Sequence, residues 1–288
     1  MITPFGFIQP AAAADLLLDT YTGAEAAYSV RKLSNSYAGN CMTVYKTTGG
    51  TTQDFGFDGD GYLDVAGIES FLAGSDGYVS KWYDQSGNSR DIIIASVSNY
   101  PKLASAGTVF TDNGGKASFQ LVANYGHDLG FKLRGDKTVA SVLLNYTVAE
   151  PTQPTVSPRI IGNYAGSGAV GTQMLADVFQ GSSGGIRVFD GLNNVSCKFP
   201  DTTFAAGTVL AAYTKDTGTI TGIANGDDTA SGTTTGYGDS SDINLYVFDD
   251  RGGTNSRASA GMSEIVIWST THEVNAVSDA INAFYSIY

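Results

Sequence analysis

Short runs of apolar and β-branched residues, separated by Gly, Asn, Asp and Ser, recur along almost the whole chain and limit what it can fold into. Runs of this length that are bounded by turn-forming residues are typical of strands. The pattern predicts an all-β fold, a two-sheet antiparallel β-sandwich. The predicted strands are residues 28–33, 42–47, 78–83, 92–97, 139–148, 171–179, 186–189, 209–214, 243–248 and 262–268.

Two segments read as helices, a short one near 64–73 and a C-terminal one near 271–286. Asp64 can cap the first helix. Thr270 and Glu273 have the spacing of a capping box before the second. An apolar stripe on each predicts a face that docks on the sheet. The stripes are Val65, Ile68 and Leu72 in the first helix, and Val274, Val277, Ile281, Phe284 and Tyr288 in the second.

Composition narrows the class of protein and the partners. The chain has 288 residues, of which 42% are hydrophobic, and no run approaches the roughly 20 apolar residues that span a bilayer, so membrane insertion is not expected. Sixteen basic and 28 acidic residues give a net charge of −12, which repels nucleic acid. Cys41 and Cys197 are too few for a disulfide framework. The predicted organisation is an N-terminal arm, 1–20, that docks on another subunit, and one domain, 21–288.

Three segments carry a resemblance to a known family: 28–33 (YSVRKL), 53–58 (QDFGFD) and 77–88 (GYVSKWYDQSGN). Together they resemble a concanavalin-like jelly-roll module of bacteriophage tail and head-associated proteins. The same module is similar to the catalytic domain of alpha-L-arabinofuranosidase B. The resemblance implies that a two-sheet jelly roll extends over roughly 20–288.

The segment from Trp82 to Asn88 allows two interpretations. Trp82, Tyr83, Asp84 and Asn88 combine aromatic rings with polar groups, a combination that can bind a glycan. The same residue types also build a strand that ends in a tight turn, with side chains that bind free backbone amides.

Glycoside hydrolysis needs two carboxyl groups on either side of the scissile bond. The resemblance places the family's nucleophile, a Glu, at Leu175, and a leucine cannot attack an anomeric carbon. Asp177 lies two positions further on, and Asp249 and Asp250 follow a late strand, as the family's acid and base does. Because the nucleophile position holds Leu175, no catalytic residue is predicted, and these three aspartates remain the candidates of an enzymatic alternative.

Metal and cofactor sites are not expected. His127 and His272 are far apart and have no nearby cysteines, so zinc-ligand spacing is missing. The acidic segment 58–64 (DGDGYLD) has Tyr62 and Leu63 where a calcium loop of the EF-hand type needs an oxygen ligand and a glycine. It is better interpreted as a tight turn that leads into the Asp64 cap.

These observations predict a non-catalytic phage structural protein that is located in the virion, as a tail, fibre, baseplate or head-surface component. Its expected partners are other virion proteins, further copies of itself and host surface glycans. Two alternatives stay open. One is a glycosidase of the arabinofuranosidase type that acts through Asp177 and one of Asp249 or Asp250. The other is a secreted or cell-surface lectin.

Overall fold

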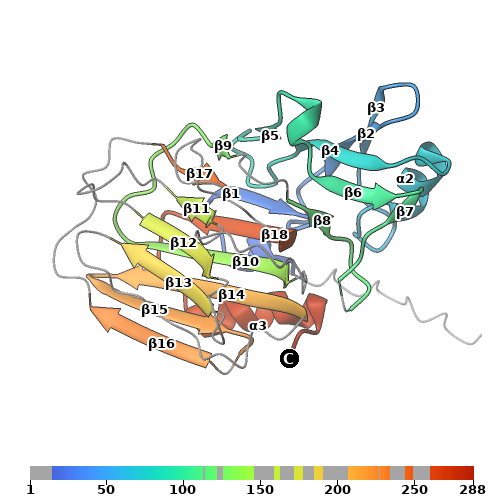
Figure 1. Cartoon of the computed structure of the whole chain (residues 1–288). Helices are drawn as coiled ribbons and strands as arrows, with labels where there is room; N and C mark the ends of the chain where they lie inside the picture. Colours follow the sequence, from blue (N-terminus) through green and yellow to red (C-terminus); the bar gives the residue numbers. More distant parts are fainter. Residues whose placement is uncertain are drawn as a thin grey trace, which may run out of the picture.

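The structure, a computed structural model, describes residues 15–112, 114–121, 126–145, 159–162, 172–177, 185–190, 207–226, 228–233, 244–248 and 260–288. In this part the chain forms one sheet of 13 strands, a second sheet of five strands and a few helices (Figure 1). All pairings between these strands are antiparallel. The predicted all-β class is confirmed, and the two sheets are consistent with a β-sandwich.

The large sheet has β10 and β18 near its middle, and further strands extend it on both sides of this pair. Its strands, in spatial order, are β16 (Asp228–Thr233), β15 (Thr219–Ala224), β14 (Gly207–Asp216), β10 (Lys137–Asn145), β18 (Ala260–Trp268), β8 (Phe119–Gln120), β6 (Lys102–Ser105), β4 (Gly77–Trp82), β2 (Met42–Lys46) and β3 (Thr51–Phe55). Three more strands pair with this path: β1 (Ala24–Ser29) with β18, β5 (Ile92–Ile93) with β4, and β7 (Thr108–Val109) with β6.

The small sheet has the order β13 (Gly185–Asp190), β12 (Thr172–Asp177), β11 (Arg159–Gly162), β17 (Tyr246–Val247) and β9 (His127–Asp128). In Figure 1 its strands β11 to β13 lie in front of β10 and β14. Ile161, Val188 and Val247 of the small sheet are fully buried in the same core as Val142 of β10. The two sheets therefore share one hydrophobic core.

β10 is buried on both of its faces. Val139, Ala140, Ser141 and Val142 all have an exposed fraction of zero, as expected for a central strand whose residues 139–144 (VASVLL) are almost all apolar. Besides the small sheet, the helix α3 (Val274–Tyr285) packs against β10, β14 and β15. This second cover explains why the run does not alternate between apolar and polar residues.

The short helix α2 (Val65–Leu72) forms as predicted. The Asp64 side chain accepts a hydrogen bond from the Gly67 amide at 2.9 Å, and Ile68 and Leu72 are buried. Ala73, the residue that ends the helix, has a left-handed backbone (φ +48°), and Gly74 continues it with a φ of +85°. Ahead of the helix, the Asp58 carboxylate accepts bonds from the amides of Asp60 and Tyr62, which is the predicted tight turn.

The C-terminal helix is confirmed, but its predicted cap is wrong. α3 begins after Glu273, which makes no side-chain capping bond. The loop before it is fixed by tertiary contacts instead, because the His272 amide donates to the Thr138 hydroxyl of β10 at 2.8 Å. The apolar stripe is buried up to Ile281, whereas Tyr288 lies beyond the helix and is 46% exposed.

The N-terminal arm and the cysteines lie partly outside the described residues. The helix α1 (Leu17–Thr20) falls within the predicted arm, and its Leu17 is buried in the core of the same chain. Residues 1–14 are outside the described part, so the division at residue 20 stays a prediction. Cys41 is fully buried and forms no disulfide, and Cys197 is not among the described residues. No described helix has the length and apolar character of a membrane span.

Candidate active site

The most specific segment of the sequence, Trp82 to Asn88, begins at the last residue of β4. Trp82 is 1% exposed, and its ring lies in the core against Tyr28 and Phe119, with ring centroids 5.5 and 4.8 Å away. Tyr83 is half-buried on the surface, where the Lys81 ammonium lies 4.0 Å from its ring centroid. A glycan contact at these residues stays a prediction, and Tyr83 is the aromatic residue of the pair that could make it.

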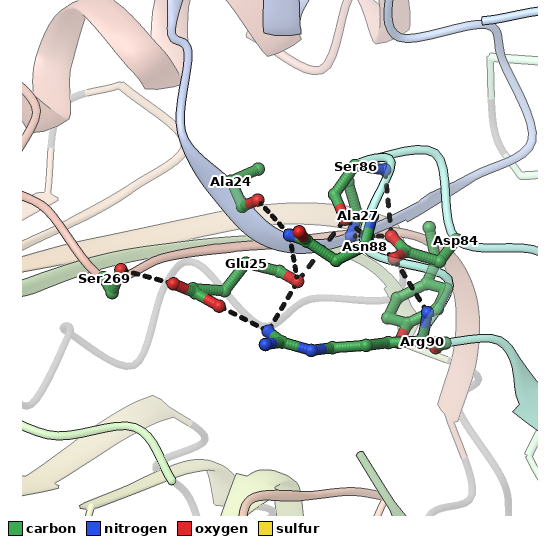
Figure 2. A network of polar contacts seen from close by, with 9 residues as sticks. Ala24, Glu25, Ala27, Asp84, Ser86, Asn88, Arg90 and Ser269 are labelled. Carbon is green, nitrogen blue, oxygen red and sulfur yellow. Dashed lines mark hydrogen bonds and ion pairs between the residues drawn. The ribbon is translucent and has the colours of Figure 1, made fainter. Parts of the chain in front are cut away.

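Asp84 is 5% exposed and accepts hydrogen bonds from backbone and side-chain donors (Figure 2). Its Oδ1 accepts from the amides of Ala27, at 2.9 Å, and Ser86, at 2.9 Å. Its Oδ2 accepts from the Ser86 hydroxyl at 2.7 Å and from the Arg90 amide at 3.0 Å. The carboxylate thus holds the turn together and ties it to β1, which leaves it no lone pair for chemistry on a substrate.

Two amide side chains extend the same connection. Gln85 accepts a bond from the Leu33 amide and donates to the carbonyls of Ser29 and Arg31. Asn88 donates to the carbonyls of Ala24 and Glu25 (Figure 2). The segment therefore ties β4 to β1 and to the residues that follow it.

An ion pair that the sequence analysis did not predict lies beside this turn. Arg90 binds the Glu25 carboxylate, and the Ser269 hydroxyl donates to the same group at 2.8 Å (Figure 2). Burial raises the pKa of Glu25, but the bonds from Ser269 and Arg90 outweigh it, and the net pKa lies below its ordinary value. An anion held in this way is unsuited to act as a general acid near neutral pH.

Asp177, one of the three catalytic candidates, lies in the small sheet. In β12, Met174 pairs with Ile161 of β11, and on the other side of β11 the same Ile161 pairs with Val247 of β17. Both neighbours are antiparallel to β11, so β12 and β17 run in the same direction with one strand between them. Asp177 is the last residue of β12 and pairs with Gly185 of β13.

The chain places further acidic residues after β17. Phe248 follows this strand, and its amide donates to the Ile160 carbonyl of β11 at 2.9 Å. Asp249 and Asp250 come next in the sequence but lie outside the described residues. Because strands in a sheet are about 4.8 Å apart, the backbones of β12 and β17 are separated by roughly 9.6 Å. Strands that run in the same direction end at the same edge of a sheet, so both lead toward one edge.

The two histidines lie in different parts of the fold. His127 pairs with Val247 across β9 and β17, and burial lowers its pKa. His272 lies elsewhere, between the rings of Tyr21 and Trp268, with centroids 5.6 and 5.3 Å away. Within the described ranges, no three His, Cys, Asp or Glu residues lie together as a metal ion would require.

Comparison with known proteins shows a similarity to alpha-L-arabinofuranosidases. Residues 13–131 match the family model of the catalytic domain of alpha-L-arabinofuranosidase B. A solved arabinofuranosidase in complex with arabinofuranosyl-alpha-1,2-xylobiose is similar with a TM-score of 0.68 and 16% identity, over 93% of this chain and 64% of that one. A GH54 alpha-L-arabinofuranosidase soaked with a cyclic sulfate inhibitor gives a TM-score of 0.65 and 17% identity over the same shares. No curated protein matches the sequence.

At this level of identity the structural likeness shows the fold, and the chain spans 64% of the length of these solved proteins. Even so, the matches contradict three predictions: a phage structural protein, a non-enzyme and a location in the virion. The resemblance to arabinofuranosidase B is supported, whereas the resemblance to phage proteins is not. The wrong predictions depended on Leu175, where the resemblance places the family's nucleophile; this position lies outside the matched residues 13–131, so its assignment stays a prediction.

Proposed function

We propose that the chain is a glycoside hydrolase that acts on alpha-L-arabinofuranosides. The observation that carries this proposal is the likeness to an arabinofuranosidase over 93% of the chain, with a TM-score of 0.68. The match to the family model over residues 13–131 supports it independently. Activity on this class of substrate is therefore the first property to measure.

Asp177 and one of Asp249 or Asp250 are the proposed catalytic pair. Hydrolysis with retention needs two carboxyl groups about 5–5.5 Å apart, and inversion needs about 6.5–9.5 Å. Side chains from two strands whose backbones are roughly 9.6 Å apart can reach either range. The strand directions at β12 and β17 favour this pair over the Glu25 and Asp84 carboxylates, whose oxygens are already bound by donors.

In the proposed reaction one carboxylic acid gives its proton to the oxygen of the leaving group while the bond to the anomeric carbon breaks. In a retaining enzyme the second carboxylate attacks that carbon, and water later releases the sugar. In an inverting enzyme the second carboxylate removes a proton from the attacking water instead. The separation of the two carboxyl groups decides between these two courses.

The test is hydrolysis of 4-nitrophenyl alpha-L-arabinofuranoside by the full chain and its variants. Asp177→Asn keeps the size of the side chain but removes the acid, so kcat should fall by a factor of about 10³ or more, because two-carboxylate chemistry loses one of its partners. Asp60→Asn, on the exposed turn before α2, is the matched control and should keep full activity. An active Asp177→Asn protein would refute the assignment of Asp177, and an inactive wild-type chain would refute the proposed function.

A further inference from the structure

A pocket of about 560 Å³ opens beside the N-terminus of α2. Figure 1 shows α2 at the opposite end of the molecule from β12, so the pocket is separate from the proposed catalytic pair. Its floor is apolar, because Val30, Leu63 and Ala117 line it and are each at most 7% exposed. A cavity of this size is within the range of small-ligand sites, which combine an apolar surface with a few fixed polar groups.

One wall of the pocket is aromatic and carries a cation. Tyr62, 40% exposed, and Phe284 stand edge to face with their centroids 5.1 Å apart. The Lys116 ammonium lies 4.4 Å from both ring centroids. Among the described residues Lys116 has no acidic partner within ion-pair distance. The wall therefore offers an exposed ring next to an ammonium group with hydrogen-bond donors.

The rim carries three carboxylates that the backbone holds in place. One oxygen of each accepts from main-chain amides: Asp58 from Asp60 and Tyr62, Asp64 from Gly67 at 2.9 Å, and Glu69 from Val109 at 3.0 Å. No hydrogen bond from the described residues reaches the second oxygen of these groups. Acceptors fixed in advance bind a ligand with little further loss of conformational entropy.

The chemistry of the pocket selects a neutral ligand rich in hydroxyl groups. Three carboxylates against one ammonium repel an anion. The carboxylates would attract a cation, but a cationic ligand at the rings would meet the positive charge of Lys116, which lies over both rings, and of Arg31, which lies 4.8 Å from the Phe284 centroid. Sugar hydroxyls can donate to the carboxylates and accept from Lys116, while the apolar face of a sugar ring covers the part of Tyr62 that remains exposed. We propose that this pocket is a second saccharide site, for a neutral sugar or a short neutral oligosaccharide.

The test is titration of the full chain with xylotriose by isothermal calorimetry, with galacturonic acid as the anionic comparison. The choice of a pentose-based probe rests on the proposed function. The observations that define the pocket are independent of that function. We expect xylotriose to bind and galacturonic acid to bind at least tenfold more weakly. Tyr62→Ala should weaken xylotriose binding about tenfold or more, since a central aromatic contact is removed.

Two conservative variants keep the experiment decisive if Tyr62→Ala does not fold. Asp64→Asn and Glu69→Gln retain the oxygen that accepts from the backbone, so both should fold and still bind several-fold more weakly. Asp60→Asn, in the same turn but outside the pocket lining, should bind like the wild type. Equal affinity in Asp64→Asn, Glu69→Gln and wild type would overturn the proposal, as would preference for galacturonic acid or absence of xylotriose binding.

The Asp177→Asn variant separates this site from the proposed active centre. Binding that persists in this variant and is lost in the pocket variants assigns the sugar to the α2 pocket, whether or not the chain is active. Binding that is lost in Asp177→Asn and kept in the pocket variants overturns the inference and leaves the proposed function standing.

Discussion

Replacement of Asp84 by asparagine tests whether this residue stabilises the fold or binds a ligand. Asn can keep its carbonyl oxygen where Oδ1 accepts from the amides of Ala27 and Ser86. Its amide group then replaces Oδ2, which accepts from the Ser86 hydroxyl and the Arg90 amide. The hydroxyl can rotate and become an acceptor. The Arg90 amide cannot, and two donors would then face each other across about 3 Å.

The expected loss follows from that single unsatisfied contact. A hydrogen bond to a charged acceptor contributes about 1.5–3 kcal/mol, and a buried donor without a partner costs a similar amount. Asp84→Asn should therefore lower the free energy of unfolding by about 2–3 kcal/mol. Asp84→Ala, which removes all four bonds, should lower it further.

Urea unfolding followed by tryptophan fluorescence is the assay, because Trp82 and Trp268 are both buried and report on the core. Asp60→Asn, an exposed change of the same kind, should stay within about 0.5 kcal/mol of the wild type. If Asp84→Asn were as stable as the wild type, the structural role would be refuted. A simultaneous loss of glycan binding would then favour the ligand-binding interpretation of this segment.

Three more outcomes follow from the structure. Arg31→Met should lower the free energy of unfolding in urea by about 3–5 kcal/mol, because it leaves the fully buried Glu264 carboxylate, 2.8 Å from the Arg31 guanidinium, without its cation. The double variant Arg31→Met, Glu264→Gln should recover much of that loss. Burial lowers the pKa of His127, so the unfolded chain binds a proton that the folded chain does not, and stability should fall as the pH drops below about 6.5. The variant His127→Gln should show a smaller change in the free energy of unfolding between pH 7 and pH 5. Gly107→Ala should lower the melting temperature more than Gly115→Ala. Both glycines have a positive φ, but a Cβ at Gly107 would lie 2.7 Å from the main-chain nitrogen of Gly74, whereas a Cβ at Gly115 would meet no atom within 4 Å.

The wrong prediction of function depended on a part of the chain that lies outside the residues matched by the family model. The segments that carried the resemblance lie within 13–131, the residues that match the arabinofuranosidase B model. The resemblance places the nucleophile in a later strand, where a shift of two residues would exchange Leu175 for Asp177. Both residues lie on β12 and have the same strand parity, so alternation of apolar and polar residues could not reveal such a shift.

The all-β class, most of the longer strands and both helices could be predicted from the amino-acid sequence, because these depend on local periodicity and on caps such as Asp64. Strands of two to four residues, such as β7, β8 and β11, carry too little periodicity to be recognised alone. Three features became visible only in the folded molecule: Asp84 accepts a bond from the Ala27 amide of β1, Glu25 binds Arg90, and β12 and β17 flank β11. Those contacts join residues far apart in the chain, and which partners meet is fixed by packing of the two sheets around their shared core.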